Sequence, residues 1–82
     1  MRWMTNADEL QTLSRVRGLV ANRTAKPIRL AARLSLSEVA QVVGVSSAAV
    51  CRWEAGDRQP RGEAGVRYGE LLESLLRGGS KR

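Results

Sequence analysis

Apolar residues recur at helical spacing in two segments, one near each end of the chain. A helix that follows a Thr5 or Asn6 cap and runs to about Ala21 would carry an apolar stripe of Leu10, Leu13, Val16 and Val20. A second helix, in the C-terminal third, would carry Ala64, Tyr68, Leu71, Leu72, Leu75 and Leu76. Gly65 and Gly69 lower the helix propensity of that segment. Because no segment alternates apolar and polar residues as a strand does, we predict an all-α protein.

Between these segments, a break at residues 22–24 precedes a shorter predicted helix. Pro27 is tolerated only in the first turn of a helix, so this helix begins near Ala25. We expect its buried side to consist of Ile28, Leu30, Ala31 and Leu34.

Two helix-start signals about eleven residues apart mark the middle of the chain. The first is formed by Ser35 and Glu38, which have the spacing of a capping box and predict a helix that opens at Leu36. The buried face of this helix would consist of Val39, Ala40 and Val43. Gly44 then supplies the left-handed residue that a tight turn requires.

The second signal is Ser46, which can cap a short helix from Ser47 to Ala55. Val50 and Trp53 face inward in this helix, and its outward face consists of Ser47, Ala48, Cys51, Arg52 and Ala55. A short helix with a small, polar exposed face fits the DNA major groove. The two helices and their turn therefore predict a helix-turn-helix.

The composition excludes several classes of function. Among the 82 residues, 14 Lys and Arg oppose 8 Asp and Glu, and the resulting net charge of +6 suits a phosphate backbone. The lone Cys51 excludes an intrachain disulfide, and the absence of histidine excludes a Cys/His zinc site and removes the commonest general base. We expect neither enzymatic activity nor a cofactor or metal. Without a signal peptide or an apolar run of about 20 residues, we expect no membrane contact and a cytoplasmic location, in a bacterium or a phage-infected host.

From Pro27 to about Leu76, the chain resembles the XRE family of helix-turn-helix regulators, which includes phage repressors and Cro proteins. The resemblance rests on Leu34-Ser35-Leu36-Ser37-Glu38-Val39-Ala40, Gly44-Val45-Ser46, Val50, Arg52-Trp53-Glu54, Gly56 and Pro60, which match in register without a gap. It implies a small five-helix, lambda-repressor-like fold with an extra N-terminal helix. Residues 1–24 would form an N-terminal extension, residues 25–77 the DNA-binding domain and residues 78–82 a basic tail. The resemblance also implies a structural ion pair between Arg29 and Glu54.

The chain departs from the family pattern in three respects. Leu36 stands where phage repressors often carry a glutamine that braces the recognition helix against the DNA backbone. Arg33 stands where the preceding helix often ends in glycine, so we expect backbone strain or a different helix end there. The recognition helix also lacks the glutamines that read adenine in some phage repressors, so the family supplies no operator sequence.

The outward face of the second short helix supplies the predicted base contacts. Arg52 can donate two hydrogen bonds to guanine O6 and N7. Ser47 could meet a base edge or a phosphate, and Ala48 either packs on a thymine methyl or is a neutral spacer. Cys51 shares this face, either as a contact or as an inert surface thiol.

Phosphate contacts are expected around the same face, from Ser46, Lys26, Arg58 and Arg61. Ser46 has the second role of a cap. Arg58 and Arg61 flank Pro60 in the loop that follows the DNA backbone in the family. Lys26 and Arg23 lie at the start of the preceding helix, where a solvated role is equally open. Trp53 and Tyr68 fall on apolar faces and are interpreted as core anchors rather than stacking platforms.

The predicted function is that of a sequence-specific, double-stranded DNA-binding regulator, similar to a small phage repressor or Cro, that occupies an operator as a homodimer. The dimer or partner surface is expected from Leu10, Leu13, Val16, Leu72 and Leu76, and Trp3 either joins it or staples the first helix to the core. One alternative is an antitoxin-type regulator whose N-terminal helix binds a protein partner. The others are an excisionase or architectural DNA-binding protein, and an interaction module that has lost DNA binding.

Overall fold

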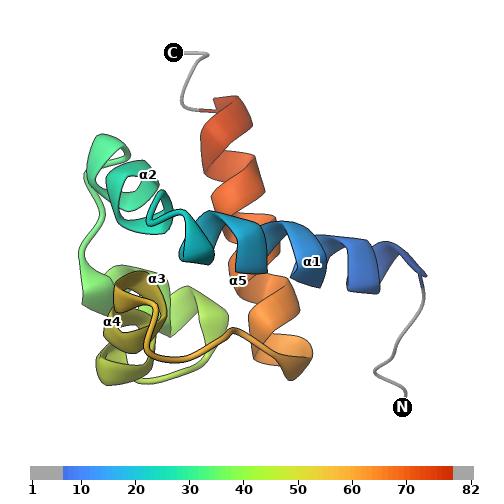
Figure 1. Ribbon diagram of the computed structural model, residues 1–82. Coiled ribbons are helices and arrows are strands. Elements are labelled where there is room, and N and C mark those ends of the chain that lie inside the picture. The colour runs from blue at the N-terminus through green and yellow to red at the C-terminus, as the bar shows by residue number, and fades with distance from the viewer. Residues whose placement is uncertain (1–6, 79–82) are drawn as a thin grey trace.

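The computed structural model describes residues 7–78, which form five helices and no strand (Figure 1). The helices are α1 (Ala7–Ala21), α2 (Ala25–Ala31), α3 (Leu36–Val43), α4 (Ser47–Ala55) and α5 (Gly62–Gly78). The predicted all-α class is confirmed. The capping role of Thr5 or Asn6, the placement of Trp3 and the last four residues of the predicted tail lie outside the described residues.

All five helices contribute to one apolar core. Its most deeply buried side chains include Val16 and Val20 from α1, Val39 and Val43 from α3, Val50 and Trp53 from α4, and Tyr68 and Leu72 from α5. α1 is therefore part of the same folding unit as the predicted helix-turn-helix. The predicted division at residue 24 does not separate two cores, because the apolar stripe of α1 packs against α5 and α4.

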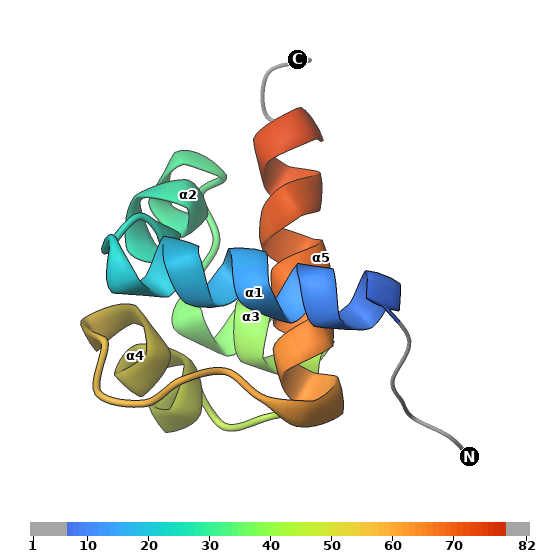
Figure 2. The same ribbon diagram turned by 45° about the vertical axis from the view of Figure 1, so that its right-hand side comes forward.

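α1 crosses α5 at close range, as both views of the ribbon show (Figure 2). Gly65 and Gly69 of α5 are buried at this crossing. A Cβ at position 69 would lie 2.7 Å from Thr12 Cγ2, and a Cβ at position 65 would lie 2.9 Å from Leu13 Cδ2. The two glycines lower helix propensity, and their lack of a side chain allows the close approach of α1.

The structure corrects the predicted buried side of α2. Leu30 is 54% exposed and Ala31 is also exposed, whereas Ala25 and Arg29 are buried and Ile28 is partly buried. Only about one face of so short a helix can meet the core, and successive residues are rotated by about 100° around the axis. Ala25, Ile28 and Arg29 lie on the side of α2 that faces the core, and Leu30, one step further around the axis, falls on the solvent side.

The structure also corrects the predicted dimer or partner surface. Leu13, Val16 and Leu72 are at most 7% exposed and belong to the core of the chain, so they present no surface. Leu10 and Leu76 are 58% and 52% exposed. Among the described helices, none combines the length and the apolar character needed to span a membrane.

Candidate functional site

α3, α4 and the turn between them have the caps that the sequence predicts. Ser35 Oγ accepts a hydrogen bond from the Glu38 N–H at 3.0 Å, and the Ser35 N–H donates to Glu38 Oε1 at 2.8 Å, which completes the capping box. Gly44 ends α3 with φ at 88°, in the left-handed region. Ser46 Oγ then caps α4 by accepting from the Ala49 N–H at 3.1 Å. Local capping thus fixes both ends of the turn.

α4 has one buried and one exposed face. Val50 and Trp53 are 0% and 7% exposed, and the Trp53 ring packs on Tyr68 with 4.7 Å between ring centroids. The side chains predicted to face outward are all exposed, namely Ser47, Ala48, Cys51, Arg52 and Ala55. The buried side anchors the helix, and the exposed side is available for contacts with another molecule.

A buried ion pair fixes α4 against α2. Arg29 Nε donates to Glu54 Oε2 at 2.5 Å and Nη2 donates to Glu54 Oε1 at 3.0 Å, while Nη1 donates to the Leu34 carbonyl at 2.9 Å. The pair expected from the resemblance is therefore present. The hydrogen bond to Glu54 raises the pKa of Arg29 despite the opposing effect of burial. Removal of one partner from such a buried pair typically costs about 3–5 kcal/mol, because the other charge is left buried without a partner.

Two clefts with basic linings flank α4. The first, here called the Arg58 cleft, is lined by Ala49, Arg52, Trp53, Arg58, Gln59 and Arg61. The second, here called the Arg23 cleft, is lined by Arg23, Lys26, Pro27, Cys51, Glu54 and Ala55. Lys26, Arg58 and Arg61, which the sequence suggests as phosphate contacts, are all exposed beside α4. The Glu54 carboxylate is already paired with Arg29, so it offsets little of the positive charge around it.

The loop that carries Arg58 and Arg61 is tied back to α1. Arg17 Nε donates to the Pro60 carbonyl at 3.0 Å, and Pro60 itself is buried. Sequence reasoning missed this contact, because residues 17 and 60 are far apart in the chain and no local signal links them. The contact limits the freedom of the loop next to the Arg58 cleft.

Two arginines occupy left-handed backbone conformations that favour glycine. Arg23 and Arg33 both have φ at 61° and follow the ends of α1 and α2. Each lies in a hydrogen-bonded helix end, in which the next residue, Thr24 or Leu34, donates to Leu19 or Arg29 respectively. The strain expected at Arg33 is present. The left-handed conformation of Arg23 was not predicted, because the only sequence feature there is the break in the apolar pattern at residues 22–24.

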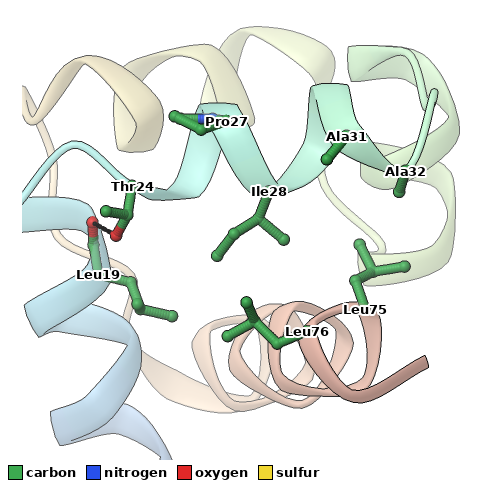
Figure 3. A pocket seen from close by; sticks show the side chains of 8 residues that line it. All are labelled: Leu19, Thr24, Pro27, Ile28, Ala31, Ala32, Leu75 and Leu76. Atoms are coloured by element: carbon green, nitrogen blue, oxygen red, sulfur yellow. Dashed lines mark hydrogen bonds between the residues drawn. The ribbon is translucent and has the colours of Figure 1, made fainter. Parts of the chain in front are cut away.

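A separate apolar groove lies between α2 and the C-terminal half of α5 (Figure 3). Ile28 and Leu76 point toward one another across it, with Leu19, Ala31 and Leu75 nearby. Among residues 7–78, no charged side chain lines the groove, and the Thr24 hydroxyl at its edge already donates to the Leu19 carbonyl at 3.0 Å. The groove could not be predicted from the sequence, because its apolar residues come together only when α1, α2 and α5 pack against one another.

Within residues 7–78, no cluster of three or more His, Cys, Asp or Glu side chains is arranged to hold a metal ion. The chain matches no protein-family model, and no curated protein or solved structure shows significant similarity to it.

Proposed function

We propose that this protein is a sequence-specific, double-stranded DNA-binding regulator of the phage repressor and Cro type, with α4 as its recognition helix. The observation that carries the proposal is the arrangement around α4. A helix capped at both ends and anchored by its buried face exposes Ser47, Ala48, Cys51 and Arg52 between two basic clefts. A short helix of this kind can enter the major groove, and the cations beside it can contact the phosphates.

The chemistry of the exposed side chains supports this assignment. The Arg52 guanidinium has the fork geometry for guanine O6 and N7, and Ala48 offers a methyl group to thymine. Ser47 begins α4, where its hydroxyl and nearby amides suit a base edge or a phosphate. The Ser46 oxygen accepts the capping bond, which leaves its O–H free to donate to a phosphate. Arg58, Arg61 and Lys26 supply the remaining phosphate contacts.

The proposal includes a homodimer, formed through the apolar groove beside Leu76. Two chains that each carry +6 repel one another, and a contact that brings no further like charges together adds least to that repulsion. Among residues 7–78, no charged residue lines this groove. A two-fold dimer would also present two copies of α4 to half-sites about one helical turn apart.

An antitoxin-type role through the N-terminal helix has weaker support. The apolar face of α1 is covered by α5 and α4, and of its stripe only Leu10 is exposed. An excisionase or architectural role uses the same DNA surface and would be recognised by bending of the bound duplex.

The decisive experiment selects bound sequences from a random duplex library at near-physiological salt, first with the wild-type protein and then with two variants. We expect the wild type to enrich a two-fold symmetric motif. Arg52→Ala should lose about 1–3 kcal/mol of discrimination at a guanine while it retains weak binding. Arg61→Ala, a matched loss of one cation, should lower affinity for all sequences and leave the motif intact. If the wild type enriches no motif, the proposed function is wrong, and if Arg52→Ala keeps the full preference, Arg52 is not the base reader.

A further inference from the structure

Arg23 combines an unfavourable backbone conformation with a position beside α4. Its φ of 61° belongs to the left-handed region, where residues other than glycine, asparagine and aspartate are uncommon. Arg33 has the same φ at the end of α2, so the backbone alone does not distinguish Arg23. What distinguishes Arg23 is that its side chain lies beside α4.

The Arg23 side chain extends from the turn between α1 and α2 to the C-terminal end of α4. A Cβ built on Gly56, which ends α4, would lie 3.7 Å from Arg23 Nε. The partial negative charge at the C-terminal end of α4 favours a cation at this position. Lys26 lines the same cleft, and Cys51 and Ala55 of α4 form its other wall.

The two clefts lie on opposite edges of the exposed face of α4. Arg52 lines the Arg58 cleft, whereas Cys51 and Ala55 line the Arg23 cleft. An α-helix with its side chains is about 10–12 Å across, and the major groove is about 12 Å wide. A helix seated there therefore has a phosphate backbone at each edge.

We propose that Arg23 and Lys26 form a second phosphate clamp, which contacts the DNA strand opposite to the one contacted by Arg58 and Arg61. This inference rests on the proposed function and extends it, because it assigns a strand to each cleft. The turn between α1 and α2 places the Arg23 guanidinium beside the C-terminal end of α4, in the same cleft as Lys26. The two clamps would fix the register of α4 across the groove.

The test measures how the affinity of the full-length protein for its selected duplex depends on salt concentration. Each phosphate contact contributes about 0.9 to the slope of log affinity against log salt. Arg23→Gly removes the guanidinium and suits the local φ, so the chain should stay folded while the slope falls by about one contact and the selected motif is unchanged. Arg23→Lys should keep the slope near that of the wild type.

Arg15→Gln provides the charge control. Arg15 pairs with Glu73 of α5 and lines neither cleft, so its loss should leave the slope unchanged. Duplexes with single neutral methylphosphonates then assign the strand. A neutral phosphate on one strand should abolish the difference between wild type and Arg23→Gly, and one on the other strand should abolish the effect of Arg58→Ala.

Three results would overturn the clamp while leaving the proposed function intact. In the first, the wild type selects a motif but Arg23→Gly leaves the salt dependence of its affinity unchanged. In the second, Arg15→Gln lowers that salt dependence as much as Arg23→Gly does. In the third, neutral phosphates on the same strand abolish the effects of both Arg23→Gly and Arg58→Ala. A purely structural role for Arg23 would appear as the first of these results together with a lower unfolding temperature. If the wild type shows neither a selected motif nor a salt-dependent affinity, the clamp and the proposed function both fail.

Discussion

Tyr68 packs its ring on Trp53 in the centre of the core, and its own environment is unusual for a tyrosine. It is 1% exposed, and its buried hydroxyl has no hydrogen-bond partner among the described residues. Burial raises the pKa of the Tyr68 phenol well above its ordinary value of 10.0, and the nearby Glu54 carboxylate adds to the effect. The folded state therefore keeps the phenol protonated at a pH where an unfolded chain would ionise it.

We predict that Tyr68 makes the protein lose stability at alkaline pH. Its raised pKa contributes stability that is fully present below pH 10, the ordinary value, and is lost as pH rises further. Urea denaturation from pH 8 to 11.5 should show a steeper fall for the wild type than for Tyr68→Phe. Other groups titrate equally in both proteins, so the difference isolates Tyr68.

The same variant tests the unpaired hydroxyl. At neutral pH, Tyr68→Phe should change the free energy of unfolding by less than about 1 kcal/mol, because no hydrogen bond is lost. Tyr68 is the single tyrosine of the chain, so phenolate absorbance reports on it alone. Ionisation of the folded protein near pH 10 would show that the phenol is accessible to water and contradict the prediction.

At the scale of single residues, features that depend on neighbours in the sequence could be predicted. Features that depend on residues brought together by folding could not. The caps at Ser35 and Ser46 depend on residues three positions apart, and the sequence identified both. The Arg29–Glu54 pair was accessible through the family resemblance. The exposure of Leu30 depends on which face of α2 meets the core in three dimensions. Arg23 ends α1 in a left-handed conformation, and the sequence has no glycine there to mark it.

At the scale of helices, the α1–α5 crossing depends on positions that lack side chains. Helical periodicity predicted both helices but described Gly65 and Gly69 only as weaknesses. That interpretation considered only the helix propensity of α5. The close approach of Thr12 and Leu13 depends on how α1 and α5 pack together. The prediction was limited because a helical glycine looks the same in sequence whether it faces solvent or another backbone.

Gly69→Ala and Gly18→Ala should change stability in opposite directions. Gly18 is exposed on α1, and a Cβ at that position would have nothing within 4 Å, so alanine there should stabilise the protein by about 0.5–1 kcal/mol. At position 69 the Cβ would lie 2.7 Å from Thr12 Cγ2 and 3.3 Å from the Thr12 carbonyl oxygen. Overpacking there should cost about 1–3 kcal/mol and exceed the gain in helix propensity. Urea denaturation of both variants measures the contrast, and equal stabilisation would mean that the crossing has room for a methyl group.

At the scale of the whole molecule, positive charge and exposed apolar surface are distributed differently. Arginines line both clefts beside α4 and Lys26 lines the Arg23 cleft, whereas the groove between α2 and α5 is apolar. The sequence predicted the residue types of both regions. It left open whether the stripe of the first helix packs on this domain or on another subunit. It did not predict that Leu72 would be buried while Leu76 stays exposed, because α5 has neighbours on only part of its length.

Leu76→Glu and Leu10→Glu should separate the proposed dimer surface from an ordinary exposed leucine. The wild type should sediment as a dimer at micromolar concentration. Leu76→Glu would place a charge in the groove contact and should give monomers, because an unpaired charge is costly to bury. Leu10 is exposed to a similar degree on α1 and lines no part of the groove, so Leu10→Glu should remain dimeric. A monomeric wild type, or dissociation by Leu10→Glu, would contradict this assignment.

The exposed face of α4 contributes no side chain to the buried core cluster. Substitutions at exposed sites without special contacts usually change stability by no more than about 0.5 kcal/mol. Mutations at Ala48, Cys51, Arg52 and Ala55 can therefore accumulate over generations without passing through unfolded intermediates. A lineage with this scaffold could rewrite this face by exchanging a handful of codons, while the inherited core stays unchanged.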